Sequence, residues 1–222
     1  LKSKKCFSTR RDKIHSHPRL IYSSKGTYFC FLAGDFGYGH ISVYNASDGN
    51  QIWMNDTSHF RFSLSAAFSQ DETILATPSI DTTVRLWDVE SGLETSLPLK
   101  HDGGVWRAVF SPDQKKLAVI SDQNDLWIWS IPNESHAQVL YFPRRLKAEI
   151  VDVAFNKAGD KIVTITIDGE FLEWDLNVPT YKPMLLTHSG VIQGYDLSKD
   201  GKWAATGGED NVVALWDMDN KR

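Results

Sequence analysis

The chain repeats itself about every 43 residues, and this internal repeat constrains its fold more than any other feature. Each copy is marked by an aromatic residue followed by a polar one, with successive spacings of 43, 42, 45 and 42. The marks are Tyr44-Asn45, Trp87-Asp88, Trp129-Ser130, Trp174-Asp175 and Trp216-Asp217. A second landmark keeps the same step, since Phe68-Ser69-Gln70-Asp71 returns at Phe110-Ser111-Pro112-Asp113 and, in looser form, from Phe155, Leu197 and Tyr22. Two landmarks in step over five copies indicate five equivalent structural units.

Within one repeat, the pattern is that of short β-strands separated by polar turns. In the second copy we predict strands over Ser63–Phe68, Ile74–Pro78 and Val84–Trp87, followed by a polar edge strand over Glu94–Pro98. Later copies predict the same first three strands over Val105–Phe110, Lys116–Ser121, Leu126–Trp129, Ile150–Phe155, Lys161–Thr166, Phe171–Trp174, Ile192–Leu197, Trp203–Thr206 and Val212–Trp216. No window predicts a helix of ten or more residues. The expected fold class is therefore all-β, a β-propeller with about five four-stranded blades in this chain.

These residues resemble the WD-repeat (Trp-Asp repeat) β-propeller family over nearly the whole chain. The markers are clearest in the second copy, as His59, Ser79, Asp81 and Trp87-Asp88. The resemblance implies that His59, Ser79, Asp81 and Trp87 form a structural hydrogen-bond network, in which Asp fixes His, His meets Ser, and Ser meets the indole N–H. The same residue types occur in hydrolase triads, but a nucleophilic serine also needs an oxyanion site in a cleft. Because other copies replace members of the set, we predict the structural role.

The repeats define one propeller domain over residues 1–222, with copies at roughly 3–45, 49–88, 94–130, 137–175 and 183–217. Each copy begins with the outer strand of the preceding blade. Seven-blade rings are the commonest in the family that the chain resembles. The sequence starts at Leu1 and stops soon after Trp216-Asp217, so we expect a fragment of a longer chain and of a larger, seven-blade ring. A five-blade ring closed by residues 3–8 is the alternative.

The resemblance also implies which side chains reach the loop-bearing face of the blades. In WD-repeat proteins these are the residues three and five positions after the His and the residue before the turn Asp. The matching positions are Phe62, Leu64, Ile80, Trp106, Asp122, Glu149, Val151, Ile167, Val191, Gln193 and Glu209. Apolar side chains with an aromatic anchor and an acidic fringe suit the recognition of a protein. Packing within the blades is the alternative for Leu64, Val151 and Trp106.

No motif for catalysis, a metal or a cofactor emerges from the sequence. His15-Ser16-His17 offers two ligands without a third at a clear spacing, and Gly103-Gly104 and Gly207-Gly208 lack the lysine and helix of a phosphate loop. The two cysteines, Cys6 and Cys30, have no metal-like spacing, and no apolar run is long enough for a membrane span. We therefore expect an intracellular protein, cytoplasmic or nuclear, that is not an enzyme and has no small-molecule substrate or membrane partner.

Positive charge is concentrated at the start of the chain. Residues 1–19 carry seven Lys and Arg side chains against Asp12, whereas the net charge of the whole chain is -4. Such a segment fits a solvated tail, a docking strand for another subunit, or a contact with RNA phosphates. A smaller basic cluster, Arg144-Arg145-Leu146-Lys147, is interpreted as a solvated loop.

The function predicted from these features is that of a non-catalytic protein–protein interaction scaffold within a multisubunit assembly, which binds its partner through the loop-bearing face. The alternative is an RNA-associated subunit of a ribonucleoprotein complex that uses the basic N-terminal segment. Salt dependence of binding separates the two, because phosphate contacts weaken steeply with salt whereas apolar docking does not.

Overall fold

The structure is a computed structural model of the whole chain, and it forms two compact units, Leu1–Gly104 and Val105–Arg222, called unit 1 and unit 2 below. It describes residues 19–34, 39–56, 58–63, 65–131, 137–138, 149–167, 170–177, 180–184, 191–198, 202–218 and 220. These residues form β-strands and no helix, and hence no helix that could cross a membrane. The expected all-β class is confirmed.

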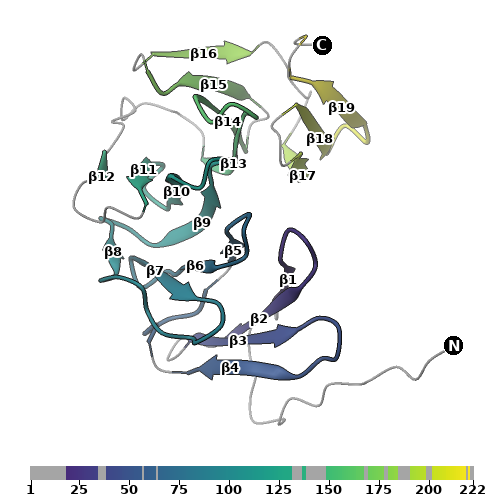
Figure 1. Cartoon of the computed structure of the whole chain (residues 1–222). Coiled ribbons are helices and arrows are strands. Elements are labelled where there is room, and N and C mark those ends of the chain that lie inside the picture. The colour runs from purple at the N-terminus through teal and green to yellow at the C-terminus, as the bar shows by residue number, and fades with distance from the viewer. Residues whose placement is uncertain are drawn as a thin grey trace, which may run out of the picture. The chain divides into compact units, whose positions relative to one another are not determined.

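Unit 1 contains two four-stranded antiparallel sheets, each with its strands in sequence order (Figure 1). The first sheet holds β1 (Arg19–Tyr22), β2 (Tyr28–Gly34), β3 (Gly39–Asn45) and β4 (Gln51–Asn55). The second sheet holds β5 (Ala67–Phe68), β6 (Ile74–Pro78), β7 (Thr83–Asp88) and β8 (Leu99–Lys100). Sequence-consecutive pairing by short turns is the topology expected of a propeller blade.

Unit 2 contains three further antiparallel sheets with the same consecutive order. The first holds β9 (Val105–Phe110), β10 (Lys116–Ser121), β11 (Leu126–Ser130) and β12 (Ala137–Gln138). The second holds β13 (Ile150–Phe155), β14 (Lys161–Thr166), β15 (Phe171–Asp175) and β16 (Thr180–Met184). The third, described as three strands, holds β17 (Ile192–Leu197), β18 (Trp203–Gly208) and β19 (Val213–Asp217). The five sheets are called blades 1 to 5 below, in chain order.

The second sequence landmark is the turn between the first and second strands of each blade. In all five blades a side-chain oxygen there accepts a hydrogen bond from the backbone amide five residues later, at 2.9–3.0 Å. The accepting residues are Ser23, Ser69, Ser111, Asn156 and Ser198. Ser and Asn favour such turns because their short side chains bond locally to the backbone. The landmark therefore sets the position of the first turn in every blade.

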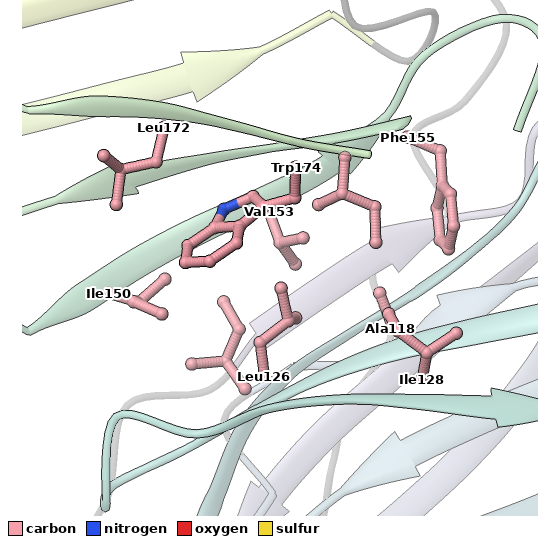
Figure 2. Close-up of a cluster of buried hydrophobic side chains, with 10 residues drawn as sticks. Ala118, Leu126, Ile128, Ile150, Val153, Phe155, Leu172 and Trp174 are labelled. Atoms are coloured by element: carbon pink, nitrogen blue, oxygen red, sulfur yellow. The ribbon is translucent and has the colours of Figure 1, made fainter. Parts of the chain in front are cut away.

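Each blade buries one face against its neighbour within a unit. In unit 2 the largest core cluster joins blade 3 to blade 4, through Ala118, Leu126 and Ile128 on one side and Phe155 and Trp174 on the other (Figure 2). Phe155 and Trp174 are each 1% exposed. In unit 1, Cys30 and Val43 of blade 1 pack with Trp87 of blade 2 in the same way. Single sheets cannot bury both faces alone, so contact between blades supplies much of the hydrophobic stabilisation.

Two strands of blade 2 differ from the sequence prediction. The first strand was expected over Ser63–Phe68, but only Ala67–Phe68 pairs with β6. Just before the expected strand, the Ser79 hydroxyl bonds the carbonyl groups of Arg61 and Phe62. The outer strand was expected over Glu94–Pro98, but ladder pairing lies at Leu99–Lys100, and only one isolated bridge joins Glu94 to Trp87. Pro98 has no backbone N–H to donate to β7, so the ladder begins only after it, at Leu99.

The sheets also clarify how the repeats map onto blades. In the structure the outer strand follows the third strand of its own sheet, as β4 follows β3 and β16 follows β15. A sequence repeat such as 49–88 therefore supplies the outer strand of one blade and the first three strands of the next. The domain boundaries and the number of blades in a complete ring stay predictions.

Candidate partner-binding face

A chain of buried hydrogen bonds fixes the inner part of blade 2. The Trp87 indole Nε1 donates to Thr77 Oγ1 at 2.8 Å, and Thr77 Oγ1 lies 2.9 Å from His59 Nε2. The other ring nitrogen, His59 Nδ1, lies 2.8 Å from Asp81 Oδ2. Thr77 and His59 are fully buried, and the Asp81 side chain is 6% exposed. A neutral His59 with its proton on Nδ1 satisfies every member, because the indole can only donate and the hydroxyl can accept and donate together.

Thr77, and not Ser79, is the hydroxyl at the centre of this network, which corrects the sequence assignment. Ser79 is also buried, but its Oγ donates to the Arg61 carbonyl at 3.0 Å and accepts from the Asp81 amide at 3.2 Å. Thr77 lies within β6, which ends at Pro78, whereas Ser79 is the first residue after the strand. Ser79 therefore leaves the ladder and pins the loop that enters the blade.

The same indole-to-threonine bond recurs in unit 2. Trp174 Nε1 donates to Thr164 Oγ1 at 2.8 Å, and Trp216 Nε1 donates to Thr206 Oγ1 at 2.7 Å, each across a separation of ten residues. Blade 3 has Val119 ten residues before Trp129 and Gln123 where blade 2 has Asp81. The recurring Trp and Thr hold strands two and three of a blade in one register.

The carboxylate of Asp81 is held in its ionised form. Burial alone raises the pKa of this group, but hydrogen bonds from His59 and Thr83 outweigh burial and lower the pKa from 3.8 to about 2. Thr83 donates to Oδ1 through both its amide, at 3.0 Å, and its hydroxyl, at 2.6 Å. The stabilisation that this carboxylate supplies is thus present above pH 4 and lost only as the pH falls toward 2.

We expect the protein to lose stability at mildly acidic pH through His101. Burial disfavours the imidazolium and lowers the pKa of His101 from 6.5 to about 4. Between these values the unfolded chain binds a proton that the folded protein does not, so the free energy of unfolding falls as the pH drops, by roughly 3 kcal/mol. Urea titrations between pH 7 and pH 4 measure this loss. In His101→Gln the same titrations should give a flatter profile, and an unchanged slope would contradict the assignment.

A second Ser–His–Asp array lies in blade 1, and sequence reasoning did not single it out. His40 Nδ1 contacts Asp56 Oδ1, and His40 Nε2 lies 3.1 Å from Ser42 Oγ. The order of contacts is that of a hydrolase triad. Ser42, however, is fully buried within β3, so its hydroxyl cannot reach a substrate. The array is a structural hydrogen-bond chain that joins β3 to the loop after β4.

In unit 1, the expected binding residues that the structure describes are only partly exposed to solvent. Phe62 and Ile80 are half-buried, and the amide of Ile80 reaches the carbonyl of Phe62 at 3.5 Å. Leu64 lies outside the described residues. The neighbouring Phe60, which the positional rule missed, is 72% exposed, and its amide donates to Asp81. An aromatic next to the network His in the loop is the signal that could have identified it.

Unit 2 exposes most of its expected binding residues. Trp106 is 37% exposed and Ile167 is 36% exposed, and Val191, the residue before β17, is 44% exposed. The side chains of Asp122, Glu149, Gln193 and Glu209 are exposed as well, whereas Val151 is half-buried and packs against the core between blades 4 and 5. The apolar and acidic residues expected at this face are thus available to a partner.

Backbone hydrogen bonds bring these residues together across two blades. The amide of Ile167 donates to the Glu149 carbonyl at 2.8 Å, and the amide of Glu209 donates to the Val191 carbonyl at 3.1 Å. The amide of Ile192 donates to the Ile167 carbonyl at 3.2 Å, which joins blade 5 to blade 4. In blade 3, Trp106 and Asp122 directly follow Val105 and Ser121, which are paired across β9 and β10.

An ion pair between a partly exposed arginine and a buried aspartate links blade 3 to blade 4. Arg107 Nε lies 2.9 Å from Asp152 Oδ1, and the Asp152 side chain is 2% exposed. Burial raises the pKa of Asp152 above its ordinary value, and the nearby Arg107 opposes that shift. Each residue directly follows an expected face residue, Trp106 or Val151. Sequence reasoning missed the pair because its members are far apart in the chain.

Metal-binding and redox features are sparse in the described residues. No group of three or more His, Cys, Asp or Glu side chains there is placed to hold a metal ion. Cys30 is a free, fully buried thiol, and burial raises its pKa, which keeps it protonated and unreactive. Cys6, His15, His17 and the basic segments 1–18 and 144–147 lie outside the described residues.

The four-stranded blades and the recurring tryptophan network are those of a β-propeller, and comparison with known proteins shows which of them the chain resembles. The model of the WD domain, G-beta repeat, matches residues 56–88 and 180–217. The β-propeller domain of Cps50 (Swd1) from Myceliophteria thermophila superimposes with a TM-score of 0.75, at 17% sequence identity, over 93% of this chain and 67% of that one. The resemblance seen in the sequence is confirmed in two respects: these two segments match the WD-repeat model, and the sheets are those of a β-propeller.

Curated relatives share this repeat sequence at low identity. Actin-interacting protein 1 of Drosophila melanogaster is 27% identical over 168 residues, which is 73% of this chain and 27% of that protein. THO complex subunit 3 of Arabidopsis thaliana is 28% identical over 147 residues, or 65% of this chain and 44% of that protein. The chain therefore spans less than half the length of these relatives.

Proposed function

We propose that this protein is a non-catalytic interaction scaffold that holds a protein partner on the loop-bearing face of unit 2. The observation that carries the proposal is that Trp106, Ile167 and Val191 are exposed at the same end of their sheets in three consecutive blades. Solvent-exposed apolar side chains gathered in one patch are typical of protein interaction sites. A large aromatic side chain at such a site is a common energetic anchor.

The relatives support the same class of function. THO complex subunit 3 is by its name a subunit of a complex, and WD-repeat propellers generally act without catalysis. The buried position of Ser42 and Ser79 argues in the same direction, because both candidate serine nucleophiles are inaccessible. An intracellular location, cytoplasmic or nuclear, belongs to this proposal. The basic N-terminal segment gives RNA binding no comparable structural support, because it lies outside the described residues.

We expect Trp106→Ala to weaken partner binding by roughly 2 kcal/mol or more, as the loss of an interface anchor should. The measurement is quantitative co-purification of the tagged full-length protein with its cellular partners, at several salt concentrations. Lys157→Ala, an exposed substitution in the first turn of blade 4, serves as the control and should leave recovery unchanged. Equal recovery with Trp106→Ala, at an unchanged thermal midpoint, would contradict the proposed face.

A further inference from the structure

The first strand of each blade in unit 2 contains a β-bulge at the same place. In blade 3 the pairing between β9 and β10 shifts by one residue, and Trp106 is the extra residue. Val151 of β13 and Gln193 of β17 are the extra residues in the next two blades. A bulge interrupts the alternation of a strand and re-aims the side chain at that position. The bulge in β9 therefore decides where Trp106 points.

Regular alternation along β9 would turn Trp106 inward. Side chains of a regular strand alternate between the two faces of the sheet, so Trp106 would share a face with Ala108. Ala108 is 3% exposed, whereas Trp106 is 37% exposed. The exposure of Trp106 thus depends on the bulge staying at its position.

An ion pair joins two of these bulged strands directly after the bulges. Strand β13 lies beside β9, and Arg107 Nε lies 2.9 Å from Asp152 Oδ1. Each of the two residues follows the extra residue of its own strand and is the first to resume regular pairing with the second strand of its blade. Asp152 Oδ1 also accepts a hydrogen bond from the amide of Val153 at 2.8 Å. The carboxylate is thus bonded to its own strand and to the neighbouring blade at once.

This carboxylate needs its partner because it is buried. The Asp152 side chain is 2% exposed, and burial raises its pKa, to which the nearby carboxylate of Asp196 adds. Arg107 supplies the charge that opposes this shift. A slip of either bulge by one residue would turn Arg107 or Asp152 to the other face of its sheet and leave a buried charge unpaired. The cost of that state holds both bulges where they are.

We propose that the ion pair between Arg107 and Asp152 locks the bulges of β9 and β13 in place and so keeps the Trp106 side chain exposed for the partner. Arg107 and Asp152 are positioning residues, which act on binding through Trp106. The inference rests on the proposed function only in its last step, because the exposure of Trp106 is measurable without a partner.

Hydroxyl-radical footprinting with mass spectrometry measures the exposure of Trp106 in the purified full-length protein. Asp152→Asn removes the charge but keeps an oxygen for the Val153 amide. In this variant we expect the oxidation rate of Trp106 to fall by roughly threefold or more, as the side chain turns inward. Trp203 of blade 5, which is 46% exposed, is the internal reference and should keep its rate. An unchanged rate at Trp106 would overturn the proposal.

Three further variants separate positioning from a general loss of stability. Arg107→Lys keeps a cation beside Asp152 and should leave the oxidation rate of Trp106 near that of the parent, whereas Arg107→Gln should lower it as Asp152→Asn does. Glu173→Gln removes the acidic partner of Lys161, an ion pair of 3.2 Å between β14 and β15, and should have no effect. An equal fall in Glu173→Gln would show that the loss of any ion pair in blade 4 disturbs Trp106, and the proposal would be wrong.

Co-purification with cellular partners separates this inference from the proposed function. If both hold, Asp152→Asn should lower recovery about fivefold alone and less than about twofold in the Trp106→Ala background, because both changes remove the same contact. If recovery falls with Trp106→Ala but the oxidation rate of Trp106 is unchanged in Asp152→Asn, only this inference fails. If the rate falls but Trp106→Ala leaves recovery unchanged, the ion pair positions Trp106 and the proposed face is wrong.

Discussion

Thr77→Val should lower the free energy of unfolding by about 3 kcal/mol, because two buried groups lose their partner at once. The Trp87 indole N–H and His59 Nε2 both bond to Thr77 Oγ1, and both side chains are at most 1% exposed. Valine has nearly the same shape as threonine, so little packing is lost and the effect reports the hydrogen bonds. Urea unfolding followed by tryptophan fluorescence measures the change.

The controls for Thr77→Val test which hydroxyl is central. Thr77→Ser keeps the hydroxyl and should cost less than about 1 kcal/mol. Ser79→Ala removes bonds to the Arg61 carbonyl and the Asp81 amide, and should cost about 1 kcal/mol. A larger loss in Ser79→Ala than in Thr77→Val would restore Ser79 as the centre of the network.

Gly92→Ala is expected to destabilise the protein by about 3 kcal/mol, for two separate reasons. Gly92 has a φ of +70°, in the left-handed region that disfavours a side chain. A Cβ there would also lie 2.5 Å from Trp53 Cγ and 2.7 Å from Trp53 Cδ2. The Trp53 ring cannot move freely, because its Nε1 donates to the Val89 carbonyl at 2.8 Å.

Gly26→Ala isolates the backbone contribution. Gly26 has nearly the same φ, +75°, but nothing lies within 4 Å of the position of its Cβ. This variant should therefore cost only the conformational penalty, about 1 kcal/mol. The difference between the two variants is the cost of displacing Trp53, and it should be accompanied by a change in near-ultraviolet circular dichroism for Gly92→Ala alone. Equal losses in both variants would show that Trp53 yields without cost.

Much of the fold was predictable because its determinants are local in sequence. The strands Ile74–Pro78, Lys116–Ser121 and Ile150–Phe155 have the predicted bounds in the structure. Alternation of apolar and polar residues and the Ser or Asn turn after the first strand act over a few residues, so a reader of the sequence can locate them. The misplaced β8 shows the limit, since Pro98 changes pairing with a partner strand and not the local pattern.

The residues of the candidate site depended on contacts between strands and blades that are far apart in the sequence. The positional rule named Trp106, Ile167 and Glu209 as face residues, but it gave Val151 equal rank, and only packing between blades made Val151 half-buried. The positional rule could not predict the ion pair between Arg107 and Asp152. It also could not show that Thr77, and not Ser79, accepts the hydrogen bond from the Trp87 indole. The repeat length and the strand pattern thus determined an all-β protein built of propeller blades. The tertiary structure decided which hydroxyl completes the network and which side chains reach solvent, because both depend on strand register and on the neighbouring blade.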